Sequence, residues 1–254
     1  MNRRFLLCAG MSIISLGAMQ KEFFTESTDE RKRIAVIAQA WKDMKYTHAV
    51  HRFPTSCETG GKAQVRDVMF NESSDVVSMK RQCAKDANVL LPVMMRCGRG
   101  SLVELPSHTS FNQRKGKDIW DMCIGECDGK NFKLYDHQRK LQGLINIPDI
   151  CGGKFSWARN WCLVAFNKHF CVMGVNKHGD KGVMQHLYVF KVTCESEKDK
   201  SFYQKGPVLE FLVDLGLFEN ADCADISDDG HGIVMAESDG TLHYFHLKAL
   251  DTSN

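Results

Sequence analysis

The sequence predicts an all-β protein built from repeated antiparallel hairpins and preceded by one amphipathic helix. Three segments carry the repeat, at 123–136, 173–191 and 233–246. In each segment an apolar strand precedes a turn of Gly and Asp, and a strand of alternating polarity follows. The second strand ends near an aromatic residue, at positions 135, 190 and 245, a uniform spacing of 55 residues. Equal spacing of equivalent positions indicates a repeat architecture.

The first 20 residues predict a secretory signal peptide or a signal anchor. Arg3 and Arg4 precede residues 5–19, fifteen residues without a charge, and Gly17 and Ala18 are small residues near a cleavage point. Fifteen helical residues reach roughly 22 Å, less than the ~30 Å hydrocarbon core, which favours a signal peptide over a stable span. We therefore expect the secretory pathway, either lumenal or secreted, or membrane-anchored through residues 5–19. An N-terminal segment buried in a cytoplasmic protein is the alternative.

Residues 21–62 predict a helix followed by a loop. Ser27 and Glu30 form a capping box, and a helix is expected from Arg31 to Lys45. The apolar positions at helical spacing are Ile34, Ile37, Ala38, Trp41 and Met44. We expect the stripe of Ile37 and Trp41 to pack against the domain; the alternative is that it binds a partner. Residues 55–62 (TSCETGGK) predict a loop.

Residues 63–254 are expected to form the β-domain. Before the three hairpins, four further strands are predicted at 65–70, 75–79, 89–95 and 101–105, separated by polar turns. These strands would make one more sheet of the same kind, although its sequence carries no repeat signature.

The final repeat resembles the WD-repeat β-propeller family. Residues 223–230 match the family's first strand and turn, and residues 232–237 match its second strand. Residues 238–245 match the second turn and third strand, with Phe245 where the family has Trp. The resemblance covers about residues 111–247 and is strongest in this repeat. The alternative is an ordinary antiparallel β-protein, because alternating strands with Asp-Gly turns occur there too.

The resemblance assigns structural roles to a set of signature positions. They are Asp128, Gly129, Tyr135, Asp136, Phe190, Asp225, Asp229, Gly230, Asp239, Gly240 and Phe245. No repeat keeps the family's Trp, and only the repeat ending in Tyr135 and Asp136 keeps its acid. The literal Trp120-Asp121 dipeptide precedes the second strand of its repeat and is not counted as a match.

The resemblance implies a degenerate WD-repeat-like β-propeller of four-stranded blades with an N-terminal helix. The sequence accounts for about four blades, and closed propellers have about four to eight. The ring therefore closes as a small propeller, or it needs a partner or a second copy to complete it. The implied function is a non-enzymatic scaffold for protein–protein interaction. With 33 basic and 31 acidic residues, the charge balance gives no sign of nucleic-acid binding.

Catalytic, metal and cofactor motifs are missing from the sequence. It contains no GxSxG, HExxH, GxxxxGK[ST] or GxGxxG. Asp225, Asp228, Asp229 and His231 crowd one segment, and turn chemistry accounts for them. His243 and His246 would point to opposite faces of a strand, so they cannot share a metal. We expect no catalytic residue, metal or cofactor; a secreted or lumenal hydrolase with a metal in a central channel is the alternative.

Cysteine content leaves the redox compartment open. Ten of the eleven cysteines follow the leader, enough for five disulfides in an oxidising compartment. Cys123, Cys162, Cys171 and Cys223 lie in apolar strand runs, which favours buried thiols. Cys151 precedes Gly-Gly-Lys, but no base is identified for it. A disulfide-containing β-sandwich binding module is therefore a further alternative. Asn71 begins an N-glycosylation acceptor, Asn-Glu-Ser.

Overall fold

The described part of the protein is mostly β-structure. The computed structural model describes residues 27–54, 63–83, 90–106, 109–112, 124–127, 131–135, 141–146, 164–167, 169–179, 182–193, 208–219 and 221–248. Within them lie one helix, α2, and fifteen strands, β1 to β15. The chain divides into two units, residues 1–36 and 37–254, and all the strands belong to the second.

Helix α2 spans Thr28–Lys42. Its start follows the predicted cap, since the Glu30 backbone N–H donates to Ser27 Oγ at 3.1 Å. The helix ends three residues earlier than expected, because Met44 adopts a left-handed conformation with φ 55° and the Lys45 N–H donates to the Ala40 carbonyl. Met44, the last of the apolar positions at helical spacing, lies beyond the helix, and its side chain is 59% exposed. The other four members are buried, namely Ile34, Ile37, Ala38 and Trp41.

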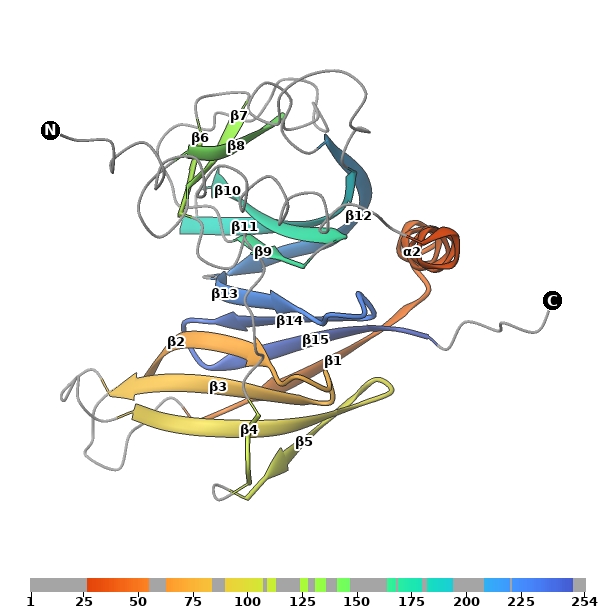
Figure 1. The fold of residues 1–254 in the computed structure, drawn as a ribbon. Helices are drawn as coiled ribbons and strands as arrows, with labels where there is room; N and C mark the ends of the chain where they lie inside the picture. Colours follow the sequence, from red (N-terminus) through yellow and green to blue (C-terminus); the bar gives the residue numbers. More distant parts are fainter. Residues whose placement is uncertain are drawn as a thin grey trace, which may run out of the picture. The chain divides into compact units, whose positions relative to one another are not determined.

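One four-stranded antiparallel sheet joins distant parts of the chain in the order β1-β15-β14-β13 (Figure 1). Its strands are β1 (Tyr46–Arg52), β13 (Ala221–Ile226), β14 (Gly232–Glu237) and β15 (Thr241–Leu247). All seven residues of β1 pair with β15. Strand β1 was not predicted, because YTHAVHR lies inside the 21–62 segment interpreted as helix and loop and lacks a clear apolar alternation. Strand β1 therefore pairs with the outer strand of the β14–β15 hairpin.

A second four-stranded antiparallel sheet runs in sequence order. It consists of β2 (Ala63–Phe70), β3 (Val76–Cys83), β4 (Leu90–Gly98) and β5 (Ser101–Leu105). These are the four strands predicted without a repeat signature, and each neighbouring pair is antiparallel.

The third sheet has seven strands in the order β6-β7-β8-β12-β11-β10-β9. The strands are β6 (Ile124–Cys127), β7 (Asn131–Tyr135), β8 (Leu141–Asn146), β9 (Val164–Phe166), β10 (Phe170–Gly179), β11 (Gly182–Thr193) and β12 (Val208–Glu219). A single parallel pair, Val208 with Asn146, joins its two halves. The three predicted hairpins are thus confirmed as β6–β7, β10–β11 and β14–β15. The expected four-stranded unit is seen in two of the three sheets.

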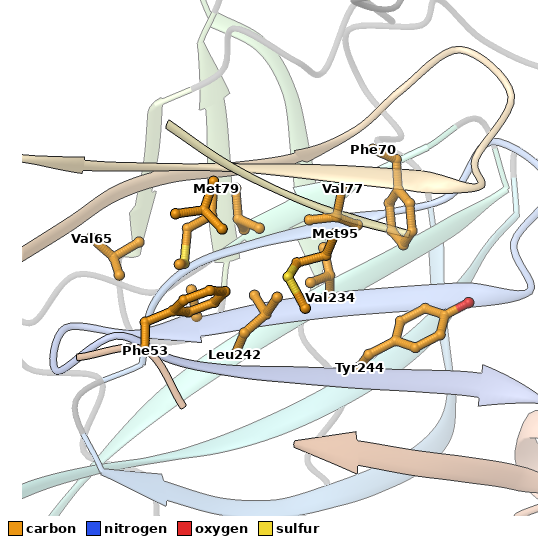
Figure 2. Close-up of a cluster of buried hydrophobic side chains, with 12 residues drawn as sticks. Phe53, Val65, Phe70, Val77, Met79, Met95, Val234, Leu242 and Tyr244 are labelled. Atoms are coloured by element: carbon orange, nitrogen blue, oxygen red, sulfur yellow. The ribbon is translucent and has the colours of Figure 1, made fainter. Parts of the chain in front are cut away.

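A hydrophobic core joins the two four-stranded sheets. Figure 2 shows its side chains between β2, β3 and β4 on one side and β14 and β15 on the other. Its members are Phe53, Val65, Val68, Phe70, Val77, Met79, Val93, Met95, Val234, Ala236, Leu242 and Tyr244. Burial of apolar surface contributes about 25 cal/mol per Å², so this core is the main attraction between the two sheets.

Shortening a core side chain should destabilise the protein strongly. Leu242 is fully buried, so Leu242→Ala removes packing and leaves a cavity, with an expected loss of about 3 kcal/mol of unfolding free energy. The matched control is Val103→Ala on β5, whose side chain is 56% exposed and should cost less than about 0.5 kcal/mol. Urea denaturation measures both, and equal losses would contradict this description of the core.

Candidate functional site

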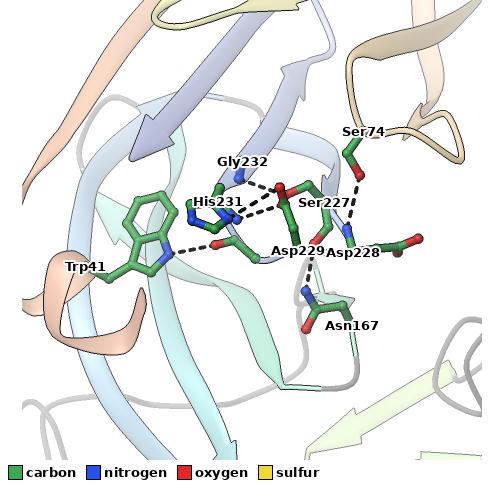
Figure 3. A network of polar contacts seen from close by, with 9 residues as sticks. Trp41, Ser74, Asn167, Ser227, Asp228, Asp229, His231 and Gly232 are labelled. Atoms are coloured by element: carbon green, nitrogen blue, oxygen red, sulfur yellow. Dashed lines mark hydrogen bonds and ion pairs between the residues drawn. The ribbon is translucent and has the colours of Figure 1, made fainter. Parts of the chain in front are cut away.

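A polar network organises the turn between β13 and β14, residues 227–231 (Figure 3). The Ser227 hydroxyl donates to Asp229 Oδ1 at 2.6 Å, and the Gly232 N–H donates to Ser227 Oγ at 2.7 Å. The His231 N–H donates to Asp229 Oδ1 at 3.0 Å, and His231 Nδ1 lies 3.3 Å from Asp229 Oδ2. Asp229 therefore fixes the turn through groups on both sides of it.

Asp229 remains ionised in this turn. Burial acts to raise the pKa of its carboxyl, but hydrogen bonds from His231 and Ser227 outweigh that effect and leave the pKa below its usual value. The turn consequently carries a fixed negative charge at neutral pH.

Three other segments of residues 37–254 hold the same turn. Trp41, in the last turn of α2, is fully buried, and its Nε1 donates to the Gly230 carbonyl at 3.0 Å. Asn167 Nδ2, between β9 and β10, donates to the Ser227 carbonyl at 2.7 Å. The Asp228 N–H donates to Ser74 Oγ in the β2–β3 turn at 3.3 Å. Such multiple attachment makes the turn rigid.

Asp225 links two sheets just before this turn. Its Oδ2 accepts a hydrogen bond from the Phe70 backbone N–H on β2 at 2.7 Å, and its Oδ1 accepts one from the Ile226 N–H at 2.9 Å. The family resemblance implies a structural position in the repeat for Asp225, and the structure places it at the contact between β13 and β2.

The β2–β3 turn is held by the side chain of Asn71. Its Nδ2 donates to Ser73 Oγ at 2.9 Å and to Asp75 Oδ1 at 2.8 Å, while its Oδ1 accepts the N–H groups of Asp75 and Val76. The side chain is buried, with 8% of its surface exposed. Glycosylation of Asn71 stays a prediction, and a glycan on Nδ2 would have to be added before this turn forms.

The structure distributes the other signature residues over several elements. Asp239 and Gly240 form the β14–β15 turn, where Asp239 Oδ1 accepts the Thr241 N–H at 2.8 Å and Gly240 has φ 94°. Phe190 on β11 and Phe245 on β15 are both buried. The backbone of Tyr135 ends β7. Asp128, Gly129 and Asp136 lie outside the described residues, as do residues 1–26, Trp120-Asp121 and the 151–154 segment.

A second polar cluster, His48, His243 and Glu237, was missed by the sequence analysis. His48 Nε2 lies 3.1 Å from His243 Nδ1, and His243 Nε2 lies 3.7 Å from Glu237 Oε1. The cluster could not be found from sequence because His48 is on the unpredicted strand β1. No group of three metal-ligating residues is found within the described ranges.

Burial changes the ionisation of this cluster. It raises the pKa of the Glu237 carboxyl to about 7, with a further contribution from Asp239, and lowers the pKa of His243 to about 4, with a further contribution from His48. Desolvation also lowers the pKa of His48. Neutral histidines are thus favoured at neutral pH.

The described cysteines include two buried or half-buried thiols. Cys97 and Cys171 are free, and burial raises the pKa of Cys97 to about 12 and that of Cys171 well above its ordinary value. Such thiols are poor nucleophiles at neutral pH.

Within the described residues, the structure contains no helix with the length and hydropathy needed to cross a membrane.

Comparisons with known proteins give similarity to solved structures alone. No protein family matches the chain, and no curated protein matches it in sequence. Among solved structures, the chain is similar to the WD40 domain of Neurospora crassa Pan2, with 9% sequence identity and a TM-score of 0.21. The match covers 76% of this chain and 65% of that domain, so it spans slightly less than two thirds of the domain's length.

A side chain at Gly230 should disrupt the turn network. Gly230 has φ 76°, and a Cβ there would lie 2.6 Å from the Phe170 ring, so Gly230→Ala combines backbone strain with a steric clash. We expect a loss of about 2 to 3 kcal/mol of unfolding free energy. Gly216→Ala is the control, since Gly216 also has a positive φ of 110° but nothing lies within 4 Å of its Cβ position. Similar losses in the two variants, measured by urea denaturation, would show that the contact with Phe170 is unimportant.

Glu237→Gln should stabilise the protein at alkaline pH. Because the folded-state pKa of Glu237 is raised from 4.5 to about 7, its stabilising contribution is complete below pH 4.5 and is lost as pH rises through 7. Glutamine does not titrate, so the variant should gain about 1 kcal/mol over the wild type at pH 8 and little at pH 4.5, allowing for partial solvent screening. The urea midpoints of the variant and the wild type, measured between pH 4.5 and pH 8, test this prediction. Glu104→Gln, at an exposed position, is the control. A pH-independent difference would contradict the raised pKa.

Proposed function

We propose that the protein is a non-enzymatic platform that binds another protein, built as a degenerate WD-repeat-like propeller of four-stranded blades. The observation that carries the proposal is a pair of joined turns, residues 71–75 and 227–231, connected by the hydrogen bond from Asp228 to Ser74. We call them the paired turns. Each belongs to a different sheet, and each is fixed internally by side-chain hydrogen bonds.

The paired turns present negative charge to solvent. Glu72, Asp75, Asp228 and Asp229 are exposed residues of these turns. Hydrogen bonds from Ser73 and Asn71 lower the pKa of Asp75, so this carboxylate, like that of Asp229, is ionised at neutral pH. A rigid surface loses little entropy on binding, and its charge favours a partner segment that contains Lys or Arg.

The hydrogen-bond pattern of the turn supports a non-enzymatic role over a hydrolase. Ser227, Asp229 and His231 have the residue types of a catalytic triad, but the Ser227 hydroxyl donates to Asp229 and not to a histidine. Ser227 is also 1% exposed, and its oxygen accepts the Gly232 N–H. A nucleophilic serine needs an effective base and access to substrate. Asp229 is a weak base because its pKa is lowered, and Ser227 is closed to solvent.

The proposal extends to the location and assembly of the protein. The features of residues 1–20 favour export to the secretory pathway, with a cytoplasmic location as the alternative. A partner or a second copy would complete the propeller if its blades do not close in one chain. The mass of the protein purified from its native cells tests the export proposal, because cleavage removes roughly 18 to 20 residues.

Loss of the exposed carboxylates should weaken partner binding at least about tenfold without unfolding the protein. The test compares proteins captured from native cells by crosslinking with the wild type, with Glu72→Ala/Asp228→Ala and with Glu104→Ala on β5. We expect the wild type and the Glu104→Ala control to recover the same partner in a constant ratio. The amount of that partner recovered with the double variant should be at least about tenfold lower. Its binding to the purified chain should also weaken with salt.

The opposite results would overturn the proposal. One is a partner retained equally by all three proteins, and another is no stoichiometric partner above the background of an unrelated protein. Thermal unfolding of the double variant is the fold control, since both side chains are exposed and their removal should leave the midpoint nearly unchanged.

A further inference from the structure

The β1–β15 pairing holds the strand that the sequence did not reveal. Among the described strands, β1 forms a ladder with β15 alone, through seven residue pairs from Tyr46–Leu247 to Arg52–Thr241. Interactions between side chains across this pairing therefore control how firmly β1 is attached.

Two imidazole rings meet across this pairing. His48 is paired with Phe245 and His243 with Val50, so the two histidines are diagonal neighbours on one face. Their ring centroids are 5.3 Å apart with an interplanar angle of 22°, and the His48 ring also stacks on Phe245 at 4.2 Å. The 3.1 Å contact of His48 Nε2 with His243 Nδ1 needs one donor and one acceptor, so at least one ring must be neutral.

We propose that the contact between His48 and His243 is acid-sensitive. It stabilises the pairing of β1 with β15 while at least one ring is neutral, and β1 separates from β15 when both rings are protonated. Double protonation removes the acceptor of the hydrogen bond. It also places two positive charges at a contact of 3.1 Å. This inference is independent of the proposed binding function.

Charged groups from four elements act on His243 or on its neighbour Glu237. They are Arg52 on β1, Glu237 at the end of β14, Asp239 in the β14–β15 turn and Glu219 at the end of β12. Arg52 and His48 disfavour a charge on His243, whereas Asp239 favours it. Glu219 acts on Glu237, whose own carboxylate is 3.7 Å from His243 Nε2.

His243 is enclosed at this position. Only 9% of its surface is exposed, and the Phe218 ring from β12 lies edge-on to it with a centroid distance of 5.0 Å. Its Nε2 is buried without a hydrogen-bond partner among the described residues. A charge on His243 is therefore poorly solvated, which strengthens the response to acid.

The order of protonation removes the counter-charge first. Glu237, with a pKa raised to about 7, accepts a proton before His243, with a pKa lowered to about 4, so the acid beside His243 is already neutral when the imidazoles are charged. The unfolded histidine has a pKa of 6.5, so the folded state binds fewer protons between 6.5 and about 4. Stability from the histidines is thus lost as pH falls through that window, whereas the stability contributed by Glu237 is lost as pH rises from 4.5 through about 7.

Hydrogen exchange of the β1 backbone tests the inference. We would compare pH 7.5 with pH 4.0, the lower end of the window set by His243, correct for intrinsic exchange, and use β3 as an internal reference. In the wild type, opening of β1 should rise at least about tenfold relative to β3 on acidification. His51→Gln is the control because His51 lies on the same strand but projects to the opposite face.

The decisive variant replaces both rings by amides that do not titrate. In His48→Gln/His243→Asn, the change in β1 opening between the two pH values should fall below about twofold. An equal acid response in this variant, or no response in the wild type, would overturn the inference. Should the double variant fail to fold, NMR titration of the wild-type rings gives an independent result. The β1 exchange must follow the histidine titration, and independence of the two would refute the proposal.

Discussion

The packing of one four-stranded sheet against another is the interaction on which the described structure depends. Its two faces come from β2–β4 and from β14–β15, and nearly every contributing side chain is excluded from water. The hairpins of each sheet expose an apolar face that no single sheet can bury alone, so pairing of the sheets is what makes both stable. Strand β1 extends one of these sheets, and Phe53, the residue that follows it, enters the same core.

Polar groups at the edge of this core have hydrogen-bond partners, and these hydrogen bonds fix the conformation of the turns. Asn167 donates to Ser227, and its Oδ1 accepts the N–H groups of His169 and Phe170. Asp225 connects β13 to β2 through the backbone of Phe70. Because a buried polar group without a partner costs about 1 to 3 kcal/mol, these bonds select one arrangement of the turns over others of equal apolar burial. Rigid, charged turns on a packed framework are suited to recognition of a partner.

The same burial that stabilises the core has opposite effects on the neighbouring ionisable groups. It disfavours the charged form of each, so it raises the pKa of Glu237 and lowers those of His48 and His243. At the paired turns, hydrogen bonds from neighbouring groups reverse the outcome and keep Asp229 ionised. The protein therefore has a charged surface at its turns and a neutral, pH-dependent cluster beside β1.

The sequence by itself determined the local elements of this protein, and the tertiary structure decided how they combine. Alternating polarity and Gly or Asp turns encode the β10–β11 and β14–β15 hairpins, and Ser27 marks the start of α2, because these signals act between residues close in the chain. Strand β1, its pairing with β15, and the contact of His48 with His243 join residues about 200 positions apart. No local pattern specifies such pairs, since they arise only when apolar faces from distant segments are buried together.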